Sequence, residues 1–413
     1  ALLPVANKPM IWYTLQWLEA NNFREIIIVA NSKASSRIGH YLNRFYIKYN
    51  DVTRLELVAF DGYPGTIQLL AALRDKLQRN SDLFLVGCDI IANVSLNSFL
   101  DNHRVKDAAV SAIFYCPVVS SGKVQDSQQA GNQTVQKQTA AGKSGANQPS
   151  DSSSFAKSSC QNDSLRYCDV IGLDKDEKRL LYFASDCDIE EPLSVNMPVF
   201  QQYGMMRIRT DLVDAHAYLI QKSVLDAALS GESLDNSNQG TRSFFSLKED
   251  LIPFIVNSNQ IGRCFAYLVP DMSGCARVNT LPSYTEVNRL RARLLPENER
   301  ISLSANIHPK SQLGTDCLIG DNSVVEEKCS IKRSIIGANV KIGNGCKIIN
   351  CIIMDQVIVE PNCKLEGVII AYRSTIGEKC TLKDCDVGCS VTVERETNAK
   401  GDCFTDGMES LSS

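Results

Sequence analysis

Four cysteines in the C-terminal third of the chain recur every 17 residues: Cys329, Cys346, Cys363 and Cys380. Thiolates could bind zinc or another soft metal, but structural zinc sites usually combine closely spaced Cys pairs with His. The repeat region contains no CxxC pair, and its one histidine, His308, precedes all four cysteines. Cysteine is small and weakly polar, so a column of equivalent positions is typical of a buried corner. We therefore expect these residues to pack in a core and to hold no metal.

The same period governs the aliphatic residues around these cysteines. Within each 17-residue line, the apolar positions are separated by six, six and five residues. Ile301, Ile307 and Leu313 extend the six-residue spacing backwards. A hexapeptide period with three faces per turn predicts a parallel β-helix of about five to six coils over residues 301–395, with a tail at 396–413. The three columns are Ile319, Ile336, Ile353, Ile370 and Val387; Val325, Ile342, Val359 and Ile376; and Ile331, Ile348, Leu365 and Leu382.

This predicted prism resembles the left-handed β-helix of hexapeptide-repeat acyltransferases and of the C-terminal part of some sugar nucleotidyltransferases. Its handedness is implied by the resemblance. The acyltransferases commonly use a histidine as general base, which makes His308 a candidate. His308 stands beside Pro309 at a predicted corner, where a structural role is the favoured interpretation.

Alternating strands and helices in the first 115 residues predict an α/β domain. A chain of 413 residues with 44% hydrophobic content can bury two cores. The alternation is typical of a mainly parallel sheet, which would bind ligands at the carboxyl ends of its strands. The predicted strands are 25–30 (EIIIVA), 55–60 (LELVAF), 83–87 (LFLVG) and 108–115, and the predicted helices are 10–20, 33–48, 67–77 and 96–105.

A segment rich in Ser, Gln, Gly and Asn interrupts this domain at 118–164 and is predicted to be a disordered insertion, because it cannot bury enough apolar surface. The domain then continues to about residue 275. A linker at 276–300 is predicted to contain a helix that opens at Pro282 and Ser283 and runs through Leu295, with Ser283 and Glu286 as a capping-box pair. Its apolar Val287, Leu290 and Leu294 could cover the open end of the prism. The later strands are expected at 167–172, 180–183, 205–210, 215–220 and 264–269, and the later helices at 223–229 and 247–256.

The composition excludes several classes of protein. Sixteen cysteines in 413 residues fall below the density of disulfide scaffolds, which favours reduced thiols in the cytosol. The net charge of −4 gives no broad basic signature for nucleic acid. No signal peptide or long apolar run is present, so no membrane span is expected. The first residue is Ala1, and we expect the chain to begin inside a longer protein.

The opening LLPVANKPMI resembles the stretch that follows the glycine-rich phosphate loop of nucleotidyltransferases that make sugar nucleotides. Gly65 and Thr66, before a predicted helix, resemble the Gly-Thr with which that family contacts the base. The strand that ends in Val-Gly-Cys-Asp resembles the family's strand ending in an acid, where Asp89 would hold magnesium between phosphates. The simpler alternative is that Gly-Thr starts a helix and Asp89 caps the next segment.

Other positions depart from that catalytic pattern. Where active members resemble Asn-Ala-Gly-Ile-Tyr, this chain has VDAHAY, with Asp214 and His216. His216 adds bulk where glycine lets a sugar approach, and Asp214 adds a charge that would oppose a phosphosugar. The family's Glu-Lys-Pro is not recognisable around 180–187. We therefore expect no catalytic residue and no cofactor, and Gly65, Thr66, Asp89, Asp214 and His216 mark a vestigial nucleotide pocket.

The whole combination resembles the gamma-subunit family of eukaryotic translation initiation factor 2B. The likeness lies in ALLPVANKPMIWYTLQWLE, TDLVDAHAYLI, FSLKEDLIPFIV and CARVNTLPSYTEVNR, which leads into the repeats. It implies an α/β nucleotidyltransferase-like (Rossmann-like) domain followed by a left-handed parallel β-helix of hexapeptide-type repeats. It also implies a non-catalytic regulatory or structural subunit of the guanine-nucleotide exchange factor for initiation factor 2.

The same resemblance implies the partners. They are a related epsilon subunit, the alpha, beta and delta subunits in a decamer, and initiation factor 2 itself as the GTPase substrate. In that group the epsilon subunit carries a helical exchange domain after its β-helix. Only about twenty residues follow Val391, so we expect this chain to support exchange without catalysing it.

Two alternatives remain open. One is an active sugar-1-phosphate nucleotidyltransferase similar to GDP-mannose pyrophosphorylase, which would require an intact phosphate loop upstream of Ala1. The other is an acyltransferase that depends on His308.

Overall fold

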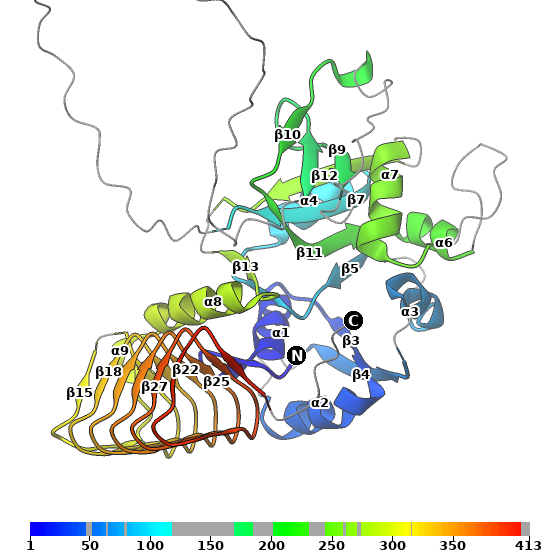
Figure 1. The fold of residues 1–413 in the computed structure, drawn as a ribbon. Helices are drawn as coiled ribbons and strands as arrows, with labels where there is room; N and C mark the ends of the chain where they lie inside the picture. The colour runs from blue at the N-terminus through cyan, green and yellow to red at the C-terminus, as the bar shows by residue number, and fades with distance from the viewer. Residues whose placement is uncertain are drawn as a thin grey trace, which may run out of the picture.

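The computed structural model describes residues 1–46, 52–62, 65–77, 81–117, 169–184, 201–230, 244–258, 262–270, 274–314 and 316–405. They form an α/β domain and a β-helical prism, with helix α8 (Leu281–Leu294) lying along the prism between them (Figure 1). The insertion predicted at 118–164 lies outside the described residues. Within the described ranges, no helix has the length and apolar character needed to cross a membrane.

The main sheet of the α/β domain has the order β12-β7-β11-β5. Strand β12 runs parallel to β7, whereas β11 runs antiparallel to both β7 and β5. The prediction of a mainly parallel sheet is therefore wrong at β11, because the alternation of strands and helices stops before that strand. The four strands are β5 (Leu83–Val86), β7 (Ala108–Tyr115), β11 (Val213–Ile220) and β12 (Arg263–Leu268).

Four smaller sheets complete the strands of this domain. Strands β3 (Glu25–Asn31) and β4 (Arg54–Phe60) form a parallel pair. Two further strands, β6 (Ile90–Ala92) and β13 (Cys275–Arg277), pair with each other and had no counterpart in the predicted elements. The remaining strands are β1 (Pro4–Val5) with β2 (Lys8–Pro9), and β8 (Val170–Leu173) between β9 (Leu180–Ala184) and β10 (Arg207–Arg209).

The helices of the first domain follow the predicted positions closely. Helix α1 buries Ile11, Leu15 and Leu18, whose spacing puts them on one face. Helix α2 starts after Asn31, whose side chain accepts a hydrogen bond from the Lys33 N–H and caps the helix. Helix α3 ends at Ala72, five residues before the predicted end. The bounds are α1 (Met10–Ala20), α2 (Ser32–Arg44), α3 (Thr66–Ala72), α4 (Asn97–Val105), α6 (Lys222–Ser230), the π-helical turn η3 (Leu247–Leu251), α7 (Ile252–Ser258) and α9 (Glu297–Arg300).

The prism consists of three six-stranded parallel sheets, which confirms the predicted β-helix. Each apolar column stacks in register, as in the pairing of Ile336 with Ile353 and of Ile353 with Ile370. The prism continues through β31 (Cys403–Phe404), past the predicted end at 395. The other strands are β14 (Asn306–Ile307), β15 (Gln312–Leu313), β16 (Leu318–Ile319), β17 (Val324–Val325), β18 (Ser330–Lys332), β19 (Ile335–Ile336), β20 (Lys341–Ile342), β21 (Lys347–Ile349), β22 (Ile352–Ile353), β23 (Ile358–Val359), β24 (Lys364–Glu366), β25 (Ile369–Ile370), β26 (Thr375–Ile376), β27 (Thr381–Lys383), β28 (Asp386–Val387), β29 (Thr392–Val393) and β30 (Asn398–Lys400).

The corners of the prism turn through residues with positive φ. These residues recur every 17 positions, as in Asn322 (φ 55°), Asn339 (φ 56°) and Gln356 (φ 61°). Glycine occupies some equivalent corners, such as Gly345 (φ 72°). Short polar residues and glycine tolerate this conformation best, whereas β-branched residues avoid it. The turn chemistry therefore repeats with the same period as the core.

One face of the prism is apolar on its outside as well as its inside. Outward-facing Leu318, Ile335, Ile352 and Ile369 precede the inward-facing residues of β16, β19, β22 and β25. Leu318 and Ile335 pack with Ala6 and Ala292, and Ile352 packs with Met10, Tyr284 and Val287. This apolar outer row docks the first domain and α8 on the prism (Figure 1).

Helix α8 differs from its prediction in two respects. Its N-cap is Thr280, whose side chain accepts from the Ser283 N–H, and Ser283 completes the capping box. The helix lies along the outer row and does not cover the open end of the prism. Leu294 remains 59% exposed, and Ile301 and Leu303 in the first coil are also exposed. Contact with the outer row places the helix, since Val287 and Ala292 of α8 pack in clusters with Ile352, Leu318 and Ile335.

Replacing a core residue of a middle coil should destabilise the protein strongly. Ile353→Ala removes a side chain that is 1% exposed and should cost about 3 kcal/mol of unfolding free energy, because it leaves a cavity between stacked coils. Ile358→Ala is the matched control, since Ile358 faces outward and is 38% exposed. Urea unfolding of both variants measures the difference, and equal losses would contradict the assigned register.

Candidate functional site

The cysteine column lies inside the prism. Its thiols donate hydrogen bonds to backbone carbonyls of the next coil, for example from Cys329 to Gly343 (3.2 Å) and from Cys363 to Gly377 (3.1 Å). All four cysteines of the column are buried. Among the described residues, no group of three or more His, Cys, Asp and Glu side chains is placed to hold a metal ion. The burial of these cysteines and their hydrogen bonds to backbone carbonyls agree with the packing interpretation.

His308 lies on the surface of the first coil. Its Nε2 is 3.3 Å from Glu327 Oε1, and its Nδ1 accepts a hydrogen bond from the Lys310 N–H. Both ring nitrogens thus have partners within one corner of the prism. These contacts agree with a structural role for His308, in which the side chain stabilises the turn.

Gly65 and Thr66 contact a segment of their own chain. Gly65 is the N-cap of α3, and a Cβ there would lie 2.3 Å from the Phe245 carbonyl oxygen. The Thr66 hydroxyl accepts a hydrogen bond from the Leu247 N–H at 2.6 Å, and the Ile67 N–H donates to Phe245 O at 3.3 Å. The polar groups that would face a base are thus engaged by residues 245–247.

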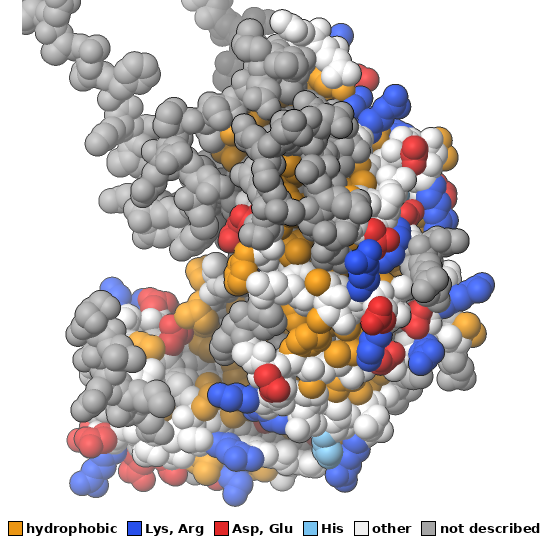
Figure 2. Space-filling model, turned by 90° about the vertical axis from the view of Figure 1, so that its right-hand side faces the viewer, with side chains coloured by type: hydrophobic (Ala, Val, Ile, Leu, Met, Phe, Trp, Pro, Cys, Tyr) orange, Lys and Arg blue, Asp and Glu red, His pale blue; other side chains and the backbone are white. Residues whose placement is uncertain are grey.

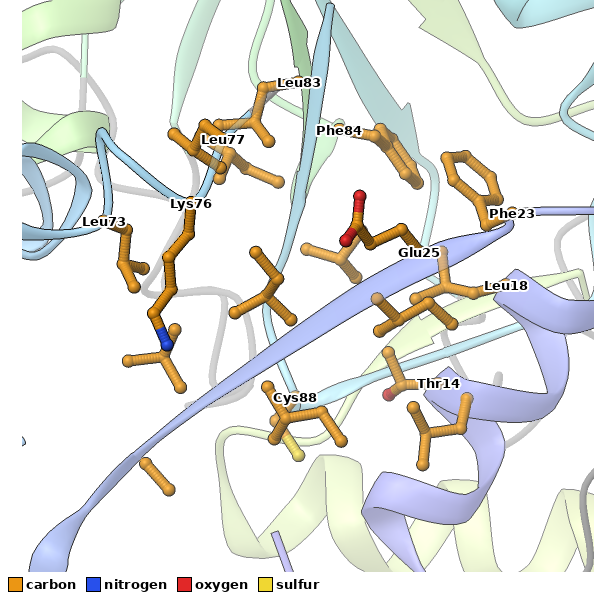
Figure 3. Close-up of a pocket in the computed structure, with 18 of the residues that line it drawn as sticks. Thr14, Leu18, Phe23, Glu25, Leu73, Lys76, Leu77, Leu83, Phe84 and Cys88 are labelled. Atoms are coloured by element: carbon orange, nitrogen blue, oxygen red, sulfur yellow. The ribbon is translucent and has the colours of Figure 1, made fainter. Parts of the chain in front are cut away.

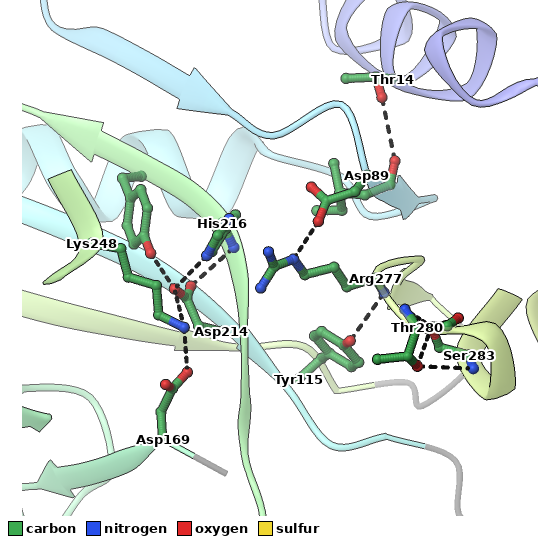
Figure 4. A network of polar contacts seen from close by, with 12 residues as sticks. Thr14, Asp89, Tyr115, Asp169, Asp214, His216, Lys248, Arg277, Thr280 and Ser283 are labelled. Atoms are coloured by element: carbon green, nitrogen blue, oxygen red, sulfur yellow. Dashed lines mark hydrogen bonds and ion pairs between the residues drawn. The ribbon is translucent and has the colours of Figure 1, made fainter. Parts of the chain in front are cut away.

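Asp89 forms an ion pair with Arg277 across 188 positions of sequence. Arg277 Nε lies 2.5 Å from Asp89 Oδ2, and the Arg277 N–H donates to the Tyr115 hydroxyl at 3.0 Å (Figure 4). The Val278 N–H donates to the Asp89 carbonyl at 2.7 Å. The guanidinium neutralises the carboxylate that a magnesium ion would need. The residues present therefore do not fit a magnesium site at Asp89.

Asp214 is fully buried among polar partners (Figure 4). Its carboxylate accepts hydrogen bonds from the Tyr218 hydroxyl and from the His216 N–H (3.0 Å), and Lys248 Nζ lies 4.0 Å away. Lys248 also pairs with Asp169 at 3.0 Å. Burial raises the pKa of Asp214 to about 6, although the Lys248 charge and the Tyr218 hydrogen bond oppose that shift. The expectation that Asp214 presents a charge to a ligand is wrong, because the side chain points into the domain.

His216 sits at an irregularity in the pairing of β11 with β7, between Asp214 and Tyr218. Its φ is 52°, a conformation that glycine adopts more readily. Its side chain is 28% exposed, and Nε2 is buried without a hydrogen-bond partner. Burial, followed by the nearby Arg277 and Lys248 charges, lowers the pKa of His216 to about 4. The imidazole is therefore neutral at neutral pH.

The five predicted site residues form two groups. Gly65 and Thr66 form one, and Asp89, Asp214 and His216 form the other. Gly87 brings Asp89 and His216 together, since a Cβ at Gly87 would lie 2.5 Å from Asp89 Oδ1 and 3.4 Å from His216 Cβ. Residues 245–248 join this cluster to Gly65 and Thr66, because Leu247 bonds Thr66 and Lys248 faces Asp214.

The site predicted from the sequence did not include several residues of the polar network around Asp89 and Asp214. Tyr218 had a local signal, since it follows Asp214 at a distance of four residues in the same strand. Arg277, Lys248 and Asp169 come from other segments and had none.

Two family models match this chain. Residues 1–123 match the nucleotidyl transferase family, and residues 300–399 match the family described as the EIF2B subunit epsilon LbH domain. The fold and site thus define a nucleotidyltransferase α/β domain followed by a left-handed β-helix of about six turns.

Curated relatives narrow this class. The chain is 24% identical over 398 residues to translation initiation factor eIF2B subunit gamma of Dictyostelium discoideum, covering 83% of this chain and 82% of the relative. It is 25% identical over 351 residues to subunit gamma of Schizosaccharomyces pombe, covering 80% and 68%. The Dictyostelium epsilon subunit is 24% identical over 339 residues, covering 78% of this chain and 41% of that subunit. The chain is thus similar, at 24–25% identity over about four fifths of its length, to gamma subunits of eIF2B.

Adding a methyl group at Gly65 should destabilise the domain. Gly65→Ala places a Cβ against the Phe245 carbonyl and should cost about 1–3 kcal/mol, because neither backbone can move freely. Gly39→Ala is the control, since Gly39 lies inside α2 and its nearest contact would be at 3.4 Å. The control should gain up to about 1 kcal/mol from helix propensity. Thermal unfolding distinguishes the two, and an unchanged melting temperature for Gly65→Ala would contradict the contact.

Asp214→Asn should change how stability depends on pH. The folded pKa of Asp214 is raised from 3.8 to about 6, so its contribution to stability is present below pH 3.8 and lost as the pH rises through 6. The variant lacks that loss, and relative to the original chain it should gain about 1–3 kcal/mol between pH 4 and pH 7.

His216 also makes stability depend on pH, in the opposite direction to Asp214, and it is present in both proteins as an internal control. Its lowered pKa makes its contribution fully present above pH 6.5 and lost as the pH falls toward 4, in both proteins. Urea unfolding at pH 4, 5, 6 and 7 measures the difference. A constant offset across that range would show that Asp214 is not a titrating buried group.

Proposed function

We propose that this chain is a non-catalytic regulatory and structural subunit of the guanine-nucleotide exchange factor for translation initiation factor 2. The observation that carries the proposal is the ion pair between Asp89 and Arg277, which occupies the acid of the nucleotidyltransferase pattern. Homology to gamma subunits of eIF2B supports the same function.

The proposed partners are an epsilon-type subunit, the alpha, beta and delta subunits in a decamer, and initiation factor 2. Similarity to an epsilon subunit over 78% of this chain supports pairing between two chains of related shape. The cytosol is the compartment in which this assembly would act.

The physical contribution of such a subunit is differential binding. A rigid prism joined to an α/β domain can hold the GTPase in one conformation while another subunit opens its nucleotide site. Exchange is accelerated only if the assembly binds that conformation more tightly than the nucleotide-closed one. The closed polar network around Asp214 suits this scaffold function, because Asp214 and Lys248 find their partners within the domain and need no ligand.

Two alternatives give different outcomes in the same experiment. An active sugar-1-phosphate nucleotidyltransferase would release pyrophosphate from a nucleoside triphosphate and a sugar phosphate. An acyltransferase would depend on His308, and its activity would be lost in His308→Ala.

The test is purification of the complete protein from its own cells together with bound partners. We expect an epsilon-type subunit to co-purify, and GDP release from initiation factor 2 to be slower in an assembly that lacks this chain. The chain alone should accelerate neither GDP release nor pyrophosphate release. Recovery of the chain alone as an oligomer that releases pyrophosphate would overturn the proposal.

A further inference from the structure

The surfaces of the α/β domain do not gather charge of one sign. A hollow of about 800 Å³ in this domain is lined mainly by apolar side chains, among them Leu18, Phe23 and Phe84 (Figure 3). Figure 2 shows a face of the molecule on which Lys and Arg side chains lie beside Asp and Glu side chains, around a central group of hydrophobic ones. A partner that recognises charge would therefore bind elsewhere, and the prism offers such a surface.

One sheet of the prism carries a row of lysines on its outer surface. The sheet has the order β15-β18-β21-β24-β27-β30, and from β18 onward two outer residues flank one inward apolar residue in each strand. The lysines are exposed and occur once per coil in five successive coils. We call this row the basic stripe; its members are Lys332, Lys347, Lys364, Lys383 and Lys400.

Like charges stand directly opposite each other in the basic stripe. Lys347 is the register partner of Lys364, and Lys383 is the register partner of Lys400. Equal charges at facing positions of neighbouring strands repel each other. Glu366 lies 3.4 Å from Lys383 and offsets one of these charges. Within the ranges that the structure describes, no carboxylate forms an ion pair with Lys347 or Lys364, so their charges are not neutralised by the chain itself.

The corners of the prism show the opposite arrangement at the same 17-residue spacing. There a lysine lies beside a glutamate of the next coil: Lys310 is 3.3 Å from Glu327, and Lys379 is 3.0 Å from Glu396. The chain thus matches opposite signs between coils at these corners and repeats one sign along the stripe. An anionic partner would relieve the repulsion within the stripe, which favours a binding surface over a solvated face without a partner.

The spacing of the stripe identifies the form of the partner. Neighbouring coils are about 4.8 Å apart, so five coils span about 19 Å. Along one face of an α-helix, residues three and four positions apart advance about 4.5–6 Å, and about 13 residues span the same length. Residues on one side of an extended strand advance about 6.7 Å and would fall out of step with the coils. An α-helix that lies along the prism axis therefore matches the stripe.

The neighbours of the lysines favour a protein over a nucleic acid. Ile349 lies in the same outer row, where it is the register partner of Lys332 on one side and of Glu366 on the other. An amphipathic helix carries apolar and acidic groups side by side and can contact both Ile349 and the lysines, whereas a phosphate backbone offers no apolar contact. The net charge of −4 also differs from the basic character typical of nucleic-acid-binding domains.

We propose that the basic stripe docks an acidic amphipathic α-helix of a partner protein, aligned with the prism axis. One carboxylate of the helix lies opposite each coil from β18 to β30, and an apolar side chain of the helix contacts Ile349. The sheet that contains β16, β19, β22 and β25 is already covered by α8 and the first domain. The docked helix therefore adds a second contact on another side of the prism.

A synthetic acidic helix tests the proposal on the complete protein. The probe is a fluorescent peptide of about 20 residues, stapled to remain helical, with glutamates alternately about three and four positions apart along one face. Its control has the same composition, with the glutamates spread around the helix. Fluorescence anisotropy should show that the probe binds at least about fivefold more tightly than the control peptide. Equal affinities, or no binding of the probe, would overturn the proposal.

Charge reversal locates the binding on the stripe. Lys364→Glu, in the middle of the stripe, should weaken binding of the probe about fivefold or more, because it removes one attraction and adds one repulsion. Lys341→Glu is the matched control, since Lys341 is an exposed lysine of β20 in a different sheet, and it should change the affinity by less than about twofold. Lys364→Gln should give a smaller loss, and it decides alone if Lys364→Glu does not fold. Equal effects at Lys341 and Lys364 would overturn the proposal.

Photo-cross-linking in the assembly purified from its own cells identifies the natural occupant. A photoreactive amino acid in place of Lys364 should cross-link to a protein segment that is helical and rich in Asp and Glu, and mass spectrometry identifies the sequence of that segment. A cross-link to nucleic acid, a cross-link to a segment without these properties, or no cross-link at all would overturn the proposal.

Discussion

The apolar outer row of the prism is the contact on which the rest of the structure depends. Leu318, Ile335 and Ile352 are each 4% exposed, although their side chains point away from the prism core. Each buried aliphatic side chain of this kind contributes about 1.5–3 kcal/mol. A polar contact crosses the same interface, since Asn7 Nδ2 donates a hydrogen bond to the Ile336 carbonyl. A second one, from the Ala6 N–H to Asn288 Oδ1, joins the first domain to α8.

This interface also positions the candidate site. Helix α8 begins four residues after Arg277, and Tyr284 on α8 donates a hydrogen bond to the Pro4 carbonyl at 2.7 Å. The docked helix therefore holds β13 against β6, and with it the guanidinium of Arg277 against Asp89. Docking on the prism thus helps to hold Arg277 in contact with Asp89 in the α/β domain. Asp89 and Asp214 both find polar partners within the domain, which favours a rigid scaffold over a site that opens for a ligand.

Much of the architecture could be predicted because it is encoded with a local period. The 17-residue spacing gave the three columns, and the short strands of the first domain followed from runs such as EIIIVA. The outer row carried a signal too, in the Ile-Ile pairs at 335–336, 352–353 and 369–370, which mark a face that is apolar on both sides. The sequence did not predict that α8 would pack on this row, because the apolar pattern of the helix did not specify which surface of the prism the helix would contact.

The sequence by itself determined the β-helix, its inward residues and the places where a nucleotidyltransferase pattern survives or departs. These features depend on residue type and on spacing within a few tens of residues. Only the tertiary structure decided what the site residues do. Asp89 meets Arg277 across 188 positions, and Asp214 turns inward to Tyr218 and Lys248. Such pairings depend on how separate sheets and helices pack, and no local pattern of residues specifies that packing.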